Sequence, residues 1–111
     1  MKIVVVGGGK MGLPLACMLA HRGACVTVCD IAAGLVDRIN KGIDPHNEPE
    51  LDRYLLESVT SGRLRASTDL SASVAESDAV VVLVPALLTP ERQIELLSRL
   101  EQGWNPAARS V

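Results

Sequence analysis

A glycine-rich stretch near the amino terminus has the spacing that best fits a defined chemistry. Residues 7–12 read GGGKMG and contain the pattern G-x-G-x-x-G, directly after an apolar segment. Gly7 allows a tight turn out of a strand, Gly9 lets a phosphate approach the backbone, and Gly12 lets the following helix pack closely on a sheet. The free N–H groups at the start of that helix attract phosphate. The stretch therefore predicts a site for the pyrophosphate of a dinucleotide.

An acidic residue follows at the distance expected of a ribose-binding group. Asp30 lies eighteen positions after Gly12, at the end of a second apolar segment. Its carboxylate can accept hydrogen bonds from ribose hydroxyls, and its charge would repel the 2′-phosphate of NADP. Because no arginine follows within several residues, NAD is favoured over NADP. Two alternatives stay open: FAD proteins use the same fingerprint, and Asp30 could serve only as a helix cap.

The elements that must position these groups alternate along the chain. Apolar, β-branched segments predict strands at residues 2–6, 24–29, 63–67 and 79–84. Helical periodicity and capping signals predict helices at residues 11–20, 33–40, 51–61, 69–77 and 90–102. Strands that are apolar on both faces and alternate with helices predict a parallel sheet between helical layers.

The predicted fold class is therefore α/β. We expect a Rossmann-type, doubly wound parallel sheet that is incomplete, with about four strands in the order 3-2-1-4. Residues 1–102 form the predicted dinucleotide-binding domain, and residues 103–111 form an irregular tail. The fourth strand would be an apolar edge, so self-association through it is a further expectation.

Composition and charge argue against several other classes of protein. The net charge of −2 comes without any cluster of basic residues, so no nucleic-acid partner is expected. The longest apolar run, residues 79–88, is about half of the ~20 residues that a membrane span needs, so no membrane partner is expected. The apolar segment before the glycines is too short for a secretory leader, and a cytoplasmic location is predicted.

The histidines and cysteines do not indicate a metal site. We expect His21 at a helix end and His46 on the surface of a loop, and neither has other ligands at metal-binding spacing. The three cysteines form no C-x-x-C pair and are expected to be small buried apolar groups: Cys17, Cys25 and Cys29. No metal ligand and no catalytic residue is predicted.

Several longer stretches resemble one family of oxidoreductases. The glycine loop continues as Leu13-Pro14-Leu15-Ala16. The other matching stretches are VCD at 28–30, INKG at 39–42, EPEL at 48–51, SGRLRASTD at 61–69 and SDAVVV at 77–82. Together they are similar to the N-terminal part of the UDP-glucose/GDP-mannose dehydrogenase family, whose members use NAD to oxidise a nucleotide sugar.

The resemblance implies a cofactor site and also what the chain lacks. The expected cofactor-binding residues are Gly7, Gly9, Lys10, Met11, Gly12, Asp30, Ile31, Val84, Pro85 and Ala86. At position 86 the family usually has a threonine near the nicotinamide, which alanine does not replace. The family's catalytic cysteine, lysine and asparagine lie beyond residue 111. The chain is therefore expected to hold the NAD-binding part without the catalytic and substrate domains, and not to be catalytically competent alone.

Two other functions fit parts of the pattern. One is a stand-alone regulatory module that binds a dinucleotide, and the other is a fragment of a β-hydroxyacid dehydrogenase, whose glycine loop is similar. The long excursion over residues 31–62, with a helix of its own, favours the nucleotide-sugar dehydrogenases over the first. The stretches at 48–49 and 62–69 favour them over the second.

Overall fold

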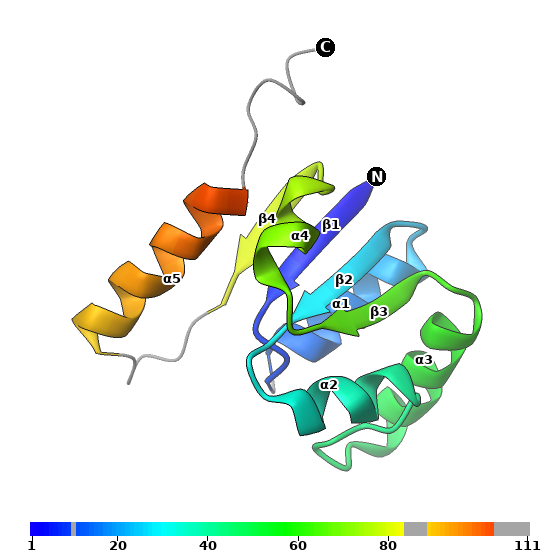
Figure 1. Cartoon of the computed structure of the whole chain (residues 1–111). Helices are drawn as coiled ribbons and strands as arrows, with labels where there is room; N and C mark the ends of the chain where they lie inside the picture. Colours follow the sequence, from blue (N-terminus) through cyan, green and yellow to red (C-terminus); the bar gives the residue numbers. More distant parts are fainter. Residues whose placement is uncertain (10, 84–88, 104–111) are drawn as a thin grey trace.

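The computed structural model of the chain describes residues 1–9, 11–83 and 89–103 (Figure 1). The strands are β1 (Lys2–Val6), β2 (Cys25–Cys29), β3 (Leu64–Ser67) and β4 (Ala79–Val82). The helices are α1 (Gly12–His21), α2 (Ala33–Asn40), α3 (Pro49–Thr60), α4 (Leu70–Ala75) and α5 (Pro90–Gly103). The order of strands and helices is the predicted one, including the two successive helices α2 and α3 between β2 and β3.

The strands form one parallel sheet in the order β3-β2-β1-β4. β1 lies in the middle, with Val5 beside Val28 of β2 and Val81 of β4. This confirms the predicted α/β class and the strand order 3-2-1-4. Because all the strands run in the same direction, their carboxyl ends lie along one edge of the sheet, where the glycine loop and Asp30 begin.

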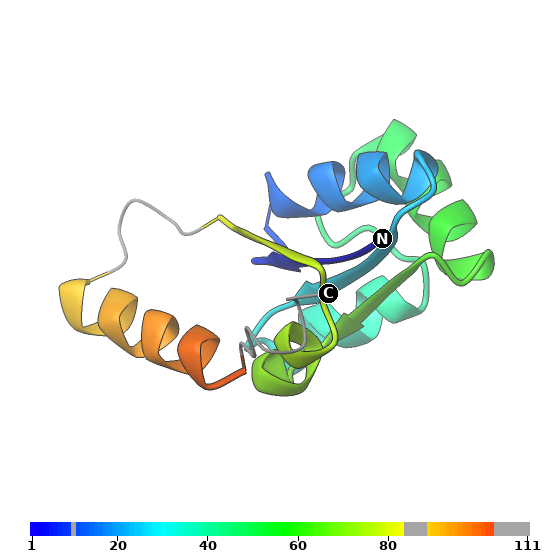
Figure 2. The ribbon, with the colours of Figure 1, turned by 90° about the horizontal axis from the view of Figure 1, so that it is seen from above.

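Both faces of the central strands are buried, which explains their unbroken apolar sequences. On one face, side chains of β1 and β2 pack against α1, α2 and α3; the core there includes Val5, Leu13, Ala16, Val28, Ile39 and Leu55. On the other face Val4, Val6 and Cys29 pack against Val74 of α4. Figure 2 shows α1 and α3 on one side of the sheet and α4 on the other.

Most differences between predicted and observed elements lie at their ends. α3 begins at Pro49 rather than at residue 51, because Pro49 takes the first helical position after an extended Glu48. α4 is the short helix expected within residues 69–77: Asp69 is its N-cap and accepts a hydrogen bond from the Ala72 N–H at 3.1 Å. β4 ends at Val82, and the predicted strand residue Val84 lies outside the described residues.

The last described element, α5, packs against α4 and lies away from the sheet beyond β4 (Figure 1). Ile94 and Leu97 of this helix are largely exposed. Of the predicted tail only Gly103 is described, as the last residue of α5. Within the described ranges, no helix combines the length and the apolar character needed to cross a membrane.

Candidate functional site

The glycine loop leaves β1 through a turn that only glycine makes easily. The Gly7 N–H donates to the Cys29 carbonyl at 2.8 Å, which continues the pairing of β1 with β2. Gly7 has a φ of +110°, and a Cβ added there would lie 2.6 Å from the Leu83 carbonyl oxygen. Backbone conformation and space therefore both require glycine here, as predicted for the tight turn.

Gly12 and Gly9 lack a side chain for different reasons. A Cβ on Gly12 would collide with the Gly7 carbonyl oxygen, so the start of α1 can approach β1 this closely only with glycine at that position. A Cβ on Gly9 would meet no atom of the described residues within 4 Å. Packing among the described residues does not need a glycine at position 9, and the open space above it is where a phosphate would fit.

The Asp30 carboxylate joins the glycine loop to the loop that follows β2. Its Oδ2 accepts a hydrogen bond from the Gly8 N–H at 2.9 Å, and its Oδ1 accepts one from the Ala32 N–H at 3.0 Å. The N-cap position of α2 is Ala32, so Asp30 is not the N-cap residue of this helix. Each carboxylate oxygen has a second lone pair, which leaves acceptor capacity for a ribose hydroxyl.

Two large apolar side chains of the predicted site lie open to solvent. Met11 is the N-cap residue of α1 and is 76% exposed, and Ile31 follows Asp30 and is 78% exposed. Exposed apolar groups beside a polar cradle are suited to contact the flat surfaces of a nucleotide. The remaining predicted site residues lie outside the described residues: Lys10, Val84, Pro85 and Ala86.

The structure adds Gly8 and His46, which sequence reasoning missed. A Cβ on Gly8 would lie between 3.0 and 3.3 Å from side-chain carbons of Leu35, Ile39 and Val28, so Gly8 is packed tightly against α2 and β2. The Nε2 atom of His46 lies 3.4 Å from the Gly8 carbonyl oxygen. The expectation of a surface histidine was wrong, because His46 is half-buried against the glycine loop. No local pattern signals a contact across 38 positions.

The cysteines are unpaired and two of them are inert. Burial, together with the negative charge of Asp44, raises the pKa of Cys17 to about 11. Burial is also the main cause that raises the pKa of Cys29. Both thiols therefore stay protonated near neutral pH. The expectation for Cys25 was wrong: it is exposed, because it lies at the first position of β2, beyond the helices that cover the strand.

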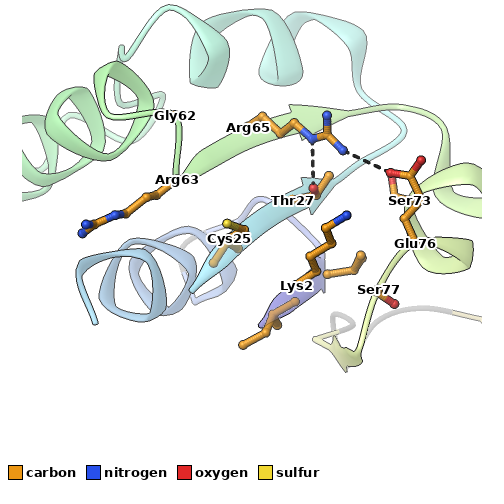
Figure 3. Close-up of a pocket in the computed structure, with 12 residues that line it drawn as sticks. Lys2, Cys25, Thr27, Gly62, Arg63, Arg65, Ser73, Glu76 and Ser77 are labelled. Carbon is orange, nitrogen blue, oxygen red and sulfur yellow. Dashed lines mark hydrogen bonds and ion pairs between the residues drawn. The ribbon is translucent and has the colours of Figure 1, made fainter. Parts of the chain in front are cut away.

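A separate cleft of about 300 Å³ lies near the amino ends of β1 and β2 (Figure 3). Lys2, Arg63 and Arg65 line it. Arg65 is already engaged, since its Nε donates to the Thr27 hydroxyl at 3.2 Å and its guanidinium pairs with Glu76 at 3.6 Å. These groups lie at the opposite end of the strands from the glycine loop. Among the described residues, no group of histidine, cysteine and acidic side chains could hold a metal ion.

Comparison with known proteins places this geometry in a family. Residues 1–101 match the model of the UDP-glucose/GDP-mannose dehydrogenase family, NAD binding domain. The match covers the whole of the sheet and reaches into α5. It favours the nucleotide-sugar dehydrogenases over the β-hydroxyacid dehydrogenases that share a similar glycine loop.

Individual relatives agree with the family match. The chain is 32% identical to GDP-mannose 6-dehydrogenase of Azotobacter vinelandii, over 98% of this chain and 26% of the relative. It is 38% identical to UDP-glucose 6-dehydrogenase of Rhizobium meliloti, over 84% of this chain and 21% of the relative. The chain thus spans about a quarter of the length of these relatives.

A solved structure of similar shape belongs to the same group. The structure of GDP-mannose dehydrogenase from Pseudomonas aeruginosa superimposes with a TM-score of 0.82 and 29% identity, over 90% of this chain and 24% of that protein. The glycine cradle, the acid after β2 and the strand order all fit the cofactor named in the family description. The chain therefore belongs to the UDP-glucose/GDP-mannose dehydrogenase family and corresponds to its NAD-binding domain.

Proposed function

We propose that this chain provides the NAD half-site of an enzyme that oxidises the primary alcohol of a nucleotide sugar. The observation that carries the proposal is the open space at Gly9 between a turn fixed by Gly7 and a helix start fixed by Gly12. The names of the relatives, a GDP-mannose and a UDP-glucose 6-dehydrogenase, support the substrate class. NAD, when bound, supplies the hydride acceptor for such an oxidation.

Each residue of the proposed site has a separate task. Gly7, Gly9 and Gly12 form the cradle for the pyrophosphate, and the N-terminus of α1 contributes partial positive charge. Asp30 accepts hydrogen bonds from the adenosine ribose and repels a 2′-phosphate. Ile31 offers apolar contact next to that ribose.

Five more residues complete the proposed set. Met11 offers apolar contact at the start of α1. Lys10, Val84, Pro85 and Ala86 stay predictions of the sequence, because they lie outside the described residues.

Binding of the reduced cofactor to the full chain tests the proposal. We expect saturable NADH binding by cofactor fluorescence, and NADPH binding that is weaker by about tenfold or more, since a buried or half-buried charge contact is worth about 1.5–3 kcal/mol. A folded chain that binds neither cofactor would contradict the proposal.

Gly9→Ala tests the cradle itself. The new methyl group meets none of the residues that the structure describes, so we expect the fold to be unchanged, but it occupies the space proposed for the phosphate. We expect NADH affinity to fall by about tenfold or more. Gly34→Ala is the matched control, because a Cβ on this α2 glycine also meets nothing within 4 Å. Equal affinity in both variants would remove the glycine-loop argument.

We also infer that the chain self-associates through β4. Within the described part of the chain, β4 pairs only with β1, so its other edge is unpaired. The strand is entirely apolar, and its last residue, Val82, is 38% exposed. An unpaired apolar edge is a template for a second strand. Sedimentation velocity over a range of concentrations tests this inference, and a monomer at every concentration would contradict it.

A cytoplasmic location is proposed as well. The cysteines of the described residues are all unpaired, and Cys25 is exposed, which fits a reducing compartment. Cell fractionation tests this proposal, and recovery from an oxidising compartment would contradict it.

A further inference from the structure

The loop before α3 contacts the glycine loop through the side chain of His46. The His46 ring lies against Gly8, with Nε2 3.4 Å from the Gly8 carbonyl oxygen. A carbonyl oxygen only accepts hydrogen bonds, so the contact requires a proton on Nε2. Neither the glycine pattern nor the ribose acid accounts for this contact.

The backbone around His46 is held by a buried carboxylate. Asp44 is 2% exposed; its Oδ1 accepts from the His46 N–H at 2.9 Å and its Oδ2 from the Glu48 N–H at 2.6 Å. The Asp44 N–H donates to Asp52 in the first turn of α3 at 3.0 Å. Asn47 takes a left-handed φ of +54°, which closes the turn between these bonds. These hydrogen bonds hold the backbone at His46 in place and so fix the position from which the imidazole extends.

Gly8 is held on its remaining sides as well. Its N–H donates to Asp30, and its Cα packs against side chains of α2 and β2. Gly9, one residue further on, is exposed, and its N–H donates to none of the described residues. The carbonyl oxygen of Gly9 accepts from the Leu13 N–H at 3.1 Å, so Gly9 is tied to the start of α1 through its carbonyl group. Glycine on both sides of the Gly8–Gly9 peptide restrains its rotation less than other residues would, so the contact at the Gly8 oxygen helps to set its orientation.

The orientation of this peptide decides where the Gly9 N–H points. In a planar trans peptide, the carbonyl oxygen and the following N–H point in opposite directions. A hydrogen bond that draws the Gly8 oxygen toward His46 therefore turns the Gly9 N–H away from the loop at residues 43–48, toward the open side of the glycine loop. There it is available to an anionic phosphate oxygen.

We propose that His46 is a positioning residue of the dinucleotide site, which fixes the Gly8–Gly9 peptide so that the Gly9 N–H faces the pyrophosphate. This inference rests on the proposed NAD half-site. It adds a role for a residue that touches the glycine loop rather than the ligand.

Three substitutions at one position separate positioning from packing. In His46→Gln the amide Nε2 lies about where the imidazole Nε2 lies and can donate to Gly8, whereas in His46→Asn the amide nitrogen is too close to the backbone to reach. We expect His46→Ala and His46→Asn to weaken NADH binding by about two- to tenfold, the range for one hydrogen bond. His46→Gln should stay within about twofold of the unchanged chain. His21→Ala, at the exposed end of α1, is the matched control and should bind like the unchanged chain.

The outcomes separate this inference from the proposed function. If Gly9→Ala loses NADH but all His46 variants bind normally, the NAD site stands and the positioning role is overturned. If His46→Gln binds NADH as weakly as His46→Asn and His46→Ala, then His46 acts by packing and the inference is also overturned. If the unchanged, folded chain does not bind NADH, the proposed function fails and the inference fails with it.

Nitrogen NMR of the imidazole gives a test that needs no substitution. In the neutral form of the His46 ring, we expect the proton on Nε2, the nitrogen that faces the Gly8 carbonyl oxygen. A proton on Nδ1 would overturn the inference, because Nε2 would then be an acceptor facing the Gly8 oxygen.

Discussion

The Asp30 carboxylate has an observed structural contact and a proposed role in selecting the ligand. Its two oxygens hold backbone N–H groups of Gly8 and Ala32, so the carboxylate fixes the glycine loop relative to the start of α2. In the proposed site, the same negative charge repels the 2′-phosphate of NADP. Removing the charge while keeping the size of the side chain separates these two effects.

Asp30→Asn is therefore expected to change both affinity and selectivity. The amide group places a donor against one of the two backbone N–H groups and lowers NADH affinity by about 1–3 kcal/mol. The preference for NADH over NADPH should shrink, because the repulsion is lost. Fluorescence titrations with both cofactors measure the two effects. Asp37 is an exposed acid paired with Lys41 on α2, so the control Asp37→Asn should leave affinity and selectivity unchanged. Unchanged NADH affinity in Asp30→Asn would mean that the Asp30 carboxylate does not contact the ligand.

The Cys17 thiol couples stability to alkaline pH. Its pKa is about 11 in the folded chain, against an ordinary value of 9.0. Between these values the unfolded chain loses the thiol proton and the folded chain keeps it, so the free energy of unfolding falls as pH rises. Below pH 9 the contribution of this group to stability is fully present.

Denaturant unfolding across that pH range, under reducing conditions, checks this coupling. We expect a shallower alkaline loss of stability in Cys17→Ala than in the unchanged chain, with a residual slope from Cys29. Cys25→Ala removes an exposed thiol and should follow the unchanged chain. Parallel curves for the Cys17 variant and the unchanged chain would contradict the assignment.

At the scale of elements, the edge of β4 is the feature with the clearest consequence. Val82→Lys places a charge on the exposed edge, and charged edge residues oppose strand pairing between molecules. We expect this variant to sediment as a monomer at concentrations where the unchanged chain associates. Thr60→Lys adds the same charge at the exposed end of α3 and should not change association. Equal association in both variants would place the contact elsewhere.

The order of the elements could be predicted from local sequence, and their ends less well. The two central strands, β1 and β2, are mostly apolar because both of their faces are covered, and this pattern is visible in the residues themselves. The start of α3 was missed because Pro49 reads as a loop residue, although proline fits the first helical turn. The exposure of Cys25 was missed because it depends on where the neighbouring helices end.

At the scale of the whole molecule, some residues of the candidate site could be predicted from local sequence and others could not. Gly7, Gly12 and Asp30 follow from a spacing rule, and the structure brings them together at the carboxyl ends of β1 and β2. His46 and Asp44 act through contacts between distant parts of the chain, which no periodicity encodes. Residues that hold a site in place are therefore harder to predict than residues that face its ligand, because they depend on packing between distant elements.

The central claim is that this chain folds into a working NAD half-site. Titration of the full chain with NADH and NADPH, with circular dichroism confirming the fold, tests it most directly. The account predicts saturable NADH binding that is about tenfold or more tighter than NADPH binding, that is lost in Gly9→Ala and that is kept in Gly34→Ala. A folded chain that binds neither cofactor, or binds both equally well, would contradict it.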